Sequence, residues 1–304
     1  MPPIVMRAAL ALALGLSCLV PAQAARLHAH GGHAQDETHW PLPDGVRVLR
    51  DLPYGPDALQ RMDVYLPPHP EGAAVLFMVH GGAWRHGDKA QERVVRNKLQ
   101  RWVARPGGQA MVLVSINYRL LPQAGPLAQV QDVARALAQA QRQAAQWGAD
   151  ARRFVVMGHS AGAHLVALLA ASPQLRQAQG VQPVLATVAL DSAAMDVPTL
   201  MRAPHLQLYD AAFGSDPQQW ALASPLQQLR QATAPLLAVC SSRRRIACAQ
   251  AERLVRQARQ LGMRAQVLPE DLSHRQTNET LGLDGPYTDA VQAFMQSVDA
   301  RLQP

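Results

Sequence analysis

Continuous apolar runs alternate with segments of helical spacing along most of the chain, and this alternation constrains the fold more than any other feature. Runs such as residues 73–79 and 110–117 are typical of strands buried on both faces of a sheet. Residues 130–147 instead carry apolar side chains at intervals of three and four, and end at Gly148. Strands that alternate with helices predict an α/β fold whose mainly parallel sheet is covered on both faces.

The expected strands lie at residues 61–66, 73–79, 110–117, 154–157, 184–190, 235–239 and 264–268. The expected helices lie at residues 91–104, 130–147, 162–171, 249–261 and 288–302. The first strand alternates and stops at Pro67-Pro68, which predicts an edge position. Residues 191–234 form a long, partly helical excursion, and a connection of this length favours a lid or pocket wall. No internal repeat is visible, so residues 46–304 are expected to form one domain.

Residues 1–24 have the layout of a secretory signal peptide. Arg7 and the terminal amine are positive, residues 8–20 are apolar, and Ala22-Gln23-Ala24 is a small-x-small cleavage site. The apolar run is too short to span a bilayer comfortably. We therefore expect a secreted or periplasmic protein without stable membrane insertion. Residues 25–45 would follow as a flexible, histidine-containing tail.

The formal net charge of +7 raises the question of nucleic-acid binding. The arginines are scattered, apart from the run at residues 243–245, and no nucleic-acid motif accompanies them, so this partner is not expected. The tail histidines have no cysteine or carboxylate cluster to complete a metal site. Neither a metal nor an organic cofactor is predicted.

Cleavage after Ala24 would leave two cysteines, Cys240 and Cys248. In an oxidising compartment an even number of cysteines favours a disulfide. They close a short loop, so the geometry decides whether the bond can form, and two buried thiols are the alternative.

The sequence Gly158-His159-Ser160-Ala161-Gly162 matches G-x-S-x-G. It follows the apolar run 154–157 and opens a helical segment, which is the strand-turn-helix setting of a nucleophile elbow. Small neighbours let the backbone turn sharply and expose the Ser160 hydroxyl. The pattern predicts Ser160 as a nucleophile.

Upstream, His80-Gly81-Gly82-Ala83-Trp84 comes directly after a buried strand. Glycines let backbone N–H groups point into a cleft, where such donors stabilise the oxyanion of acyl transfer. We expect the N–H groups of Gly82, Ala83 and Ala161 to form this oxyanion hole.

A hydrolase with such an elbow carries its serine, acid and histidine in that order. His274, in a loop after residues 264–268, is therefore the expected base. Of the other histidines, His164 is expected to pack on its helix, His205 to line the pocket and His159 to support the elbow.

Several motifs together resemble one known group. They are HGGAWRHGDK at 80–89, NYRL at 117–120, GHSAGAH at 158–164, FGSDPQQWALASP at 213–225 and LSH at 272–274. They are similar to α/β-hydrolase carboxylesterases of the hormone-sensitive lipase, bacterial feruloyl-esterase-like and arylformamidase-like groups. The likeness covers roughly residues 49–294 and implies an α/β-hydrolase fold with an esterase-like activity.

One departure from that group concerns the acid, which the group carries just after the strand at 235–239. Residues 240–248 contain no Asp or Glu. Asp191, at the end of the preceding strand, is our leading candidate, and Asp196, Glu270 and Asp271 are the alternatives. A Ser–His dyad and a loss of activity also remain open, because loss of the acid costs a serine protease about 10⁴ in turnover.

The expected function is hydrolysis of a small-molecule carboxylic ester through an acyl-enzyme on Ser160. Amide or formamide hydrolysis uses the same tetrahedral chemistry and remains an alternative. A weakly active or non-catalytic binding protein that keeps the cleft is the other. The sequence leaves the acyl and alcohol groups and the oligomeric state open.

Overall fold

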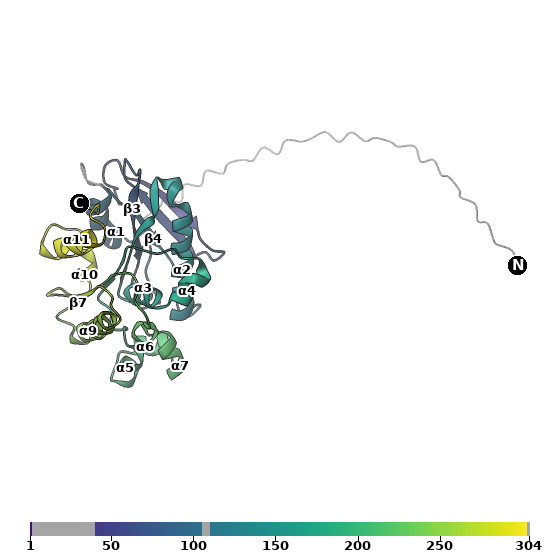
Figure 1. Cartoon of the computed structure of the whole chain (residues 1–304), viewed down its shortest axis with the longest axis vertical. Helices are drawn as coiled ribbons and strands as arrows, with labels where there is room; N and C mark the ends of the chain where they lie inside the picture. Colours follow the sequence, from purple (N-terminus) through teal and green to yellow (C-terminus); the bar gives the residue numbers. More distant parts are fainter. Residues whose placement is uncertain (2–39, 105–109, 303–304) are drawn as a thin grey trace. The chain divides into compact units, whose positions relative to one another are not determined.

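The computed structural model describes residues 40–104 and 110–302, together with Met1. From Trp40 onward these residues form one compact unit (Figure 1). The expected signal peptide and residues 25–39 of the expected tail lie outside the described residues. Within the described part of the chain, no helix is long and apolar enough to cross a membrane.

Eight strands form one sheet in the order β1-β2-β4-β3-β5-β6-β7-β8. The pairs β1–β2 and β2–β4 are antiparallel and the other five pairs are parallel. The strands are β1 (Arg47–Pro53), β2 (Arg61–Leu66), β3 (Ala73–Val79), β4 (Val112–Ile116), β5 (Ala149–His159), β6 (Ala186–Leu190), β7 (Leu236–Ser241) and β8 (Ala265–Glu270). The expected mainly parallel sheet is thus observed.

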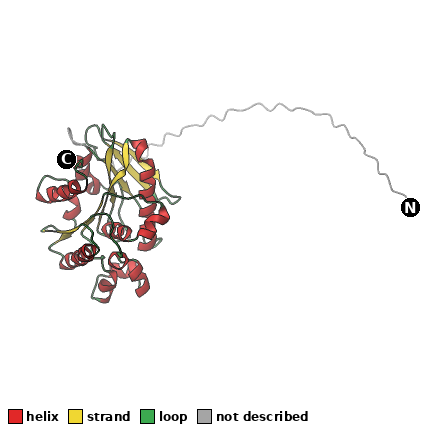
Figure 2. Ribbon diagram, viewed as in Figure 1, coloured by secondary structure: helices red, strands yellow, loops and turns green. Residues whose placement is uncertain are grey.

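Helices cover both faces of the sheet, as Figure 2 shows. They are α1 (Glu92–Lys98), α2 (Pro126–Gln143), α3 (Ala161–Ala171), α4 (Pro173–Gln179), α5 (Val197–Arg202), α6 (Gln207–Phe213), α7 (Pro217–Leu222), α8 (Pro225–Gln228), α9 (Arg245–Gln260), α10 (Gln276–Glu279) and α11 (Pro286–Val298). A π-helical turn, Leu99–Val103, extends α1, and a 3₁₀ turn, Ala144–Trp147, extends α2.

The central strand β3 is buried along its whole length, which explains its continuous apolar sequence. Successive side chains of a strand point to opposite faces. Phe77 packs in the cluster that contains α2 and α3, whereas Met78 packs in the cluster that contains α1 and α11. Helix α9 joins α3 over β7. The sheet is therefore the middle layer of three.

The expected edge position of residues 61–66 is wrong. Strand β2 lies between β1 and β4, and β1 is the edge strand on that side of the sheet. The prolines follow the last paired residue of β2, so they remove no hydrogen bond from the ladder. We did not predict β1 because it is half-exposed and its register shifts between Leu49 and Leu52.

Other expected boundaries move by a few residues. Strand β5 begins at Ala149, α2 begins at Pro126, and α9 begins at Arg245 rather than at residue 249. Residues 173–179, which we did not assign, form α4. The excursion at 191–234 contains four short helices, α5 to α8, of which α5 to α7 gather at one end of the molecule in Figure 1.

The elbow between β5 and α3 depends on close backbone contact. A Cβ atom on Gly162 would lie 2.2 Å from the Val79 carbonyl oxygen and 2.5 Å from that of His80. A Cβ atom on Gly158 would lie 2.4 Å from the Gly162 oxygen. These glycines let the first turn of α3 rest directly on the end of β3, which positions Ser160 beside the loop that follows β3.

We predict that Gly162→Ala moves α3 away from β3, because a side-chain carbon cannot approach a carbonyl oxygen so closely. Overpacking of this kind costs about 1–3 kcal/mol of unfolding free energy, which urea denaturation would measure. Gly125→Ala is the matched control, since a Cβ atom there meets nothing within 4 Å. Equal stability of the two variants would contradict the proposed contact.

Candidate active site

Ser160 lies on the sharp turn between β5 and α3. Its backbone angles are φ 57° and ψ −116°, a conformation that non-glycine residues rarely adopt. Its N–H donates a 2.9 Å hydrogen bond to the carbonyl of Leu190, at the end of the neighbouring strand β6. The turn is thus held by the sheet, and it presents the hydroxyl at the carboxyl edge of the strands.

Three of the residues singled out in the sequence form a chain of hydrogen bonds. The Ser160 hydroxyl lies 2.9 Å from His274 Nε2. On the other side of the ring, His274 Nδ1 lies 2.6 Å from Asp191 Oδ2. The serine follows β5, the aspartate follows β6 and the histidine follows β8. The sheet therefore brings together residues that are 114 and 83 positions apart in the sequence.

Asp191 is fully buried, with 0% of its surface exposed. Burial by itself would raise the pKa of its carboxyl. Hydrogen bonds from His274 and from the Ser241 N–H, together with the charge of Arg244, outweigh that effect and hold the pKa below its ordinary value. The carboxylate is therefore ionised, and its Oδ1 atom accepts the Ser241 N–H at 3.0 Å.

The other three nominated carboxylates lie elsewhere. Asp196 caps α5 through Thr199 and pairs with Arg253 at 3.1 Å. Asp271 is exposed and pairs with Arg243 at 2.7 Å. Glu270 ends β8, and no hydrogen bond of its side chain with the described residues is found. Asp191 is the candidate that reaches the His274 ring.

The loop after β3 approaches the serine closely. A Cβ atom on Gly81 would lie 2.9 Å from Ser160 Cβ, so only a glycine fits there. Gly82 and Ala83 have φ values of 122° and 52°, and both line the cleft with Ala161. Across the described residues, the N–H groups of these three donate no hydrogen bond to a protein acceptor. They are available to an oxygen atom placed in the cleft.

Trp84 and His164 hold this loop in place, and sequence reasoning missed the role of Trp84. The Trp84 indole N–H donates to His164 Nδ1 at 3.2 Å, and His164 Nε2 lies 2.7 Å from the Ala223 carbonyl oxygen. Burial lowers the pKa of His164 to about 4. Its neutral ring therefore accepts one hydrogen bond and donates the other, which links the oxyanion loop, α3 and the excursion.

The remaining two histidines, His159 and His205, differ in whether they lie at the cleft. His159 Nε2 lies 2.8 Å from the His274 carbonyl oxygen and the two rings are 4.6 Å apart. Burial, followed by the charge of His274, lowers the pKa of His159 to about 3, so its neutral ring supports the loop. His205 pairs with Asp210 at 3.0 Å, and it does not line the cleft.

The three arginine side chains at 243–245 do not all face the same way. Arg243 is exposed, whereas Arg244 turns inward. Its Nη1 atom lies 2.6 Å from Asp191 Oδ2 and 2.8 Å from His274 Nδ1. Cys240 and Cys248 are joined by a disulfide that closes this loop. The absence of an acid from the loop was visible in the sequence, but the inward turn of one arginine was not.

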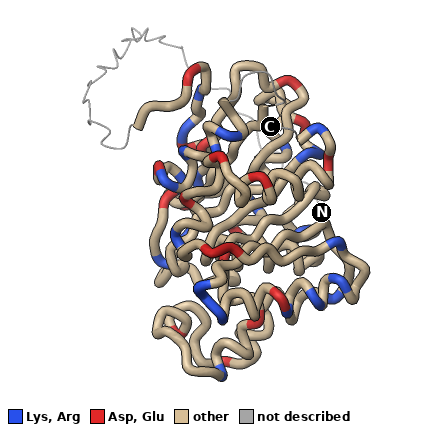
Figure 3. The backbone as a smooth tube through the Cα atoms, turned by 90° about the vertical axis from the view of Figure 1, so that its left-hand side faces the viewer, with Lys and Arg blue, Asp and Glu red and all other residues tan. Residues whose placement is uncertain are grey.

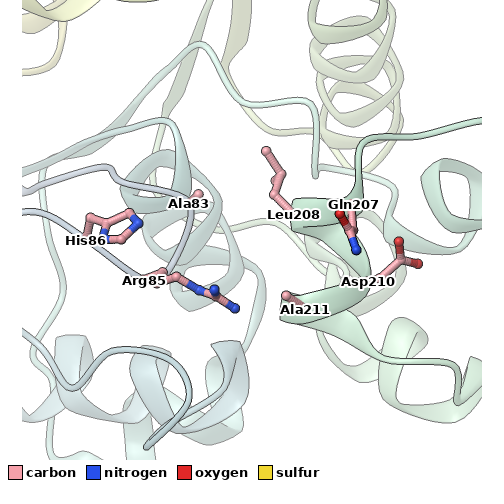
Figure 4. Close-up of a pocket in the computed structure, with 7 residues that line it drawn as sticks. All are labelled: Ala83, Arg85, His86, Gln207, Leu208, Asp210 and Ala211. Atoms are coloured by element: carbon pink, nitrogen blue, oxygen red, sulfur yellow. The ribbon is translucent and has the colours of Figure 1, made fainter.

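The cleft around Ser160 has a volume of about 610 Å³. A second cavity of about 660 Å³ lies between the oxyanion loop and α6, and it shares Ala83, His86 and Leu208 with the cleft. Figure 4 shows Arg85 extending across this second cavity toward α6. Leu206, which lines the cleft, is 63% exposed. The second cavity therefore adjoins the cleft at the oxyanion loop and at α6.

This arrangement suits acyl transfer. A hydroxyl, a histidine ring and a carboxylate in line allow proton removal from the serine, and the free N–H groups can stabilise an oxyanion. The described residues contain no cluster of three metal-ligating side chains. Basic and acidic residues are interspersed along the backbone in Figure 3, without a basic stripe.

Comparisons with known proteins agree with this geometry. The chain is 30% identical to Esterase LipC of Mycobacterium tuberculosis, over 67% of this chain and 56% of the relative. It is 32% identical to a probable isoprenylcysteine alpha-carbonyl methylesterase, ICMEL1, of Arabidopsis thaliana, over 40% of this chain and 24% of the relative. The chain therefore spans only about half, or less, of the length of these curated relatives.

Among solved structures, esterase B of Lactobacillus rhamnosis aligns over 88% of this chain and 89% of its own, with a TM-score of 0.68 and 19% identity. That likeness confirms the α/β-hydrolase fold. A model of the BD-FAE family matches residues 62–257, which include the oxyanion loop, Ser160 and Asp191. Because the match takes in well over half of the chain, this protein belongs to the BD-FAE family.

Proposed function

We propose that this protein is a serine hydrolase that cleaves a small-molecule carboxylic ester through an acyl-enzyme on Ser160. The observation that carries the proposal is the line of hydrogen bonds from Ser160 through His274 to a buried, ionised Asp191. Esterase relatives and the family match support the same reaction class.

In the proposed reaction, His274 Nε2 takes the proton of the Ser160 hydroxyl while Oγ attacks the acyl carbon. The N–H groups of Gly82, Ala83 and Ala161 stabilise the oxyanion of the tetrahedral intermediate. The imidazolium then protonates the departing alcohol, which leaves an acyl-enzyme. A water molecule, deprotonated by His274, attacks the ester carbon. As the carboxylic acid departs, the imidazolium returns this proton to Ser160 Oγ, which regenerates the free serine and the neutral histidine.

Asp191 has two functions in this scheme. It accepts the Nδ1 proton, so Nε2 is left as the base that faces Ser160, and it stabilises the positive ring that forms in each step. Its own carboxylate is held by the Ser241 N–H. In this proposal the acid has moved from the end of β7 to the end of β6.

We predict that Ser160→Ala lowers turnover of short p-nitrophenyl esters by roughly 10⁶. An active-site phosphonate should label the wild type at Ser160, which peptide mass mapping would detect. Folded protein that neither labels nor hydrolyses the esters would sink the proposal and favour a binding protein. Parallel assays with p-nitroanilides would measure any preference for amides.

Asp191→Asn should lower kcat by roughly 10⁴, because an amide favours the wrong tautomer of His274. Asp271→Asn is the matched control, since Asp271 is exposed and contacts Arg243 rather than the site. Steady-state kinetics on both variants would decide the identity of the acid. An unchanged rate in Asp191→Asn would rule out its assignment.

We also propose that the protein is exported and acts in a periplasmic or extracellular space. The layout of residues 1–24 supports this proposal, and so does the Cys240–Cys248 disulfide, a bond typical of oxidising compartments. Expression of the full chain in a bacterium should yield a periplasmic protein whose N-terminal residue is Ala25, as measured by intact mass. Uncleaved protein in the cytoplasm would contradict export.

A further inference from the structure

A permanent cation contacts the hydrogen-bonded chain at its acidic end. Arg244 Nη1 lies 2.6 Å from Asp191 Oδ2 and 3.3 Å from the Asp191 carbonyl oxygen. The same carboxylate oxygen accepts the hydrogen bond from His274 Nδ1. Two donors therefore share Oδ2, and one of them carries a charge that no ordinary pH removes.

The contact between Arg244 and His274 differs in kind from the other two. Nη1 lies 2.8 Å from Nδ1, yet a guanidinium has only donors, and in the tautomer that the proposed mechanism requires Nδ1 carries a proton as well. These two nitrogens face each other as donors. A positive charge at this distance disfavours a second positive charge on the ring. By pairing with Asp191, it also weakens the stabilisation that this carboxylate gives to a protonated ring.

The position of Arg244 is fixed by its surroundings. The Arg244 N–H donates to the Ser241 carbonyl at 2.9 Å, and its own carbonyl accepts the N–H of Ala247 in the first turn of α9. The Cys240–Cys248 disulfide closes the loop around it. Its side chain is 31% exposed and lines the cleft. These hydrogen bonds and the disulfide hold the loop, and they place the guanidinium of Arg244 beside Asp191.

We propose that Arg244 is a positioning residue that holds Asp191 toward His274 and extends activity to lower pH by opposing protonation of the His274 ring in the free enzyme. This inference rests on the proposed esterase function. A bound proton on Nε2 would block the attack of Ser160, so a cation beside the ring preserves the base to a lower pH than the same site without the cation.

The other titratable and charged groups near the His274 ring are the same in every variant. His159 stays neutral, because its pKa is about 3, and burial raises the pKa values of Tyr209 and Tyr287. Lys98 acts on His159, and burial lowers its pKa to about 7, so it titrates in the same range. The charged side chains of Arg93, Arg275 and Glu279 line the same cleft. All of these remain when Arg244 is replaced, so a difference between pH profiles isolates Arg244.

The test is the pH dependence of kcat/KM for a neutral p-nitrophenyl ester. We expect Arg244→Gln and Arg244→Met to move the acid limb upward by about one pH unit, because a charge within 4–6 Å shifts a titration by that order. Arg244→Lys, which keeps the charge, should restore most of the wild-type limb. Near-UV circular dichroism and phosphonate labelling would confirm that each variant is folded. If only one of the two neutral variants folds, that variant is enough for the test.

Arg243→Gln is the matched control, since it removes the same charge from the neighbouring residue, which lies in an exposed ion pair. Its acid limb should coincide with that of the wild type. An unmoved limb in a folded Arg244 variant would overturn the inference while wild-type turnover still upheld the esterase function. A rise of KM confined to an anionic substrate such as a p-nitrophenyl hemisuccinate, with the limb unmoved, would also overturn it and make Arg244 a substrate-binding residue.

Discussion

The contact between the first turn of α3 and the end of β3 is the constraint on which the rest of the site depends. The Gly162 backbone lies where a Cβ atom would be 2.2 Å from the Val79 oxygen. This contact places the start of the helix, with the Ala161 N–H, against the loop that carries Gly82 and Ala83. The positive φ of Ser160 follows, because the chain must reverse within one residue. Strain at this residue is compensated by the hydrogen bond to Leu190 in the next strand.

The parallel order of the sheet explains how the acid can stand on a different strand. Strands β5, β6, β7 and β8 are neighbours in that order, and each ends at the same edge. In the proposed assignment, moving the acid from β7 to β6 displaces it by one strand spacing, about 4.8 Å. The loop after β8 carries His274 back far enough to reach Asp191 at 2.6 Å. Arg244, in the loop after β7, instead pairs with Asp191 at 2.6 Å and neutralises part of its buried negative charge.

The sequence was sufficient for the layers and for the strand-turn-helix geometry at Ser160, because each depends on local patterns. Continuous apolar runs indicated strands buried on both faces, and the glycines around Ser160 indicated a tight turn. The edge strand was misassigned because β1 is half-exposed and irregular, so its pattern is weak. Four carboxylates were open as the acid because side-chain reach across strands is a tertiary property. The inward turn of Arg244 depends on the same property, since its neighbours Arg243 and Arg245 face solvent.

Two neutral histidines beside the nucleophile link stability to the pH range of the site. His164 and His159 have pKa values of about 4 and about 3 in the folded protein, against an ordinary value near 6.5. The unfolded chain therefore binds more protons below pH 6.5, and the free energy of unfolding decreases as the pH falls from there toward 4. Protonation of His164 would also remove the acceptor of the Trp84 N–H, which holds the oxyanion loop. This loss of stability on the acid side sets the lowest pH to which the proposed effect of Arg244 could extend activity.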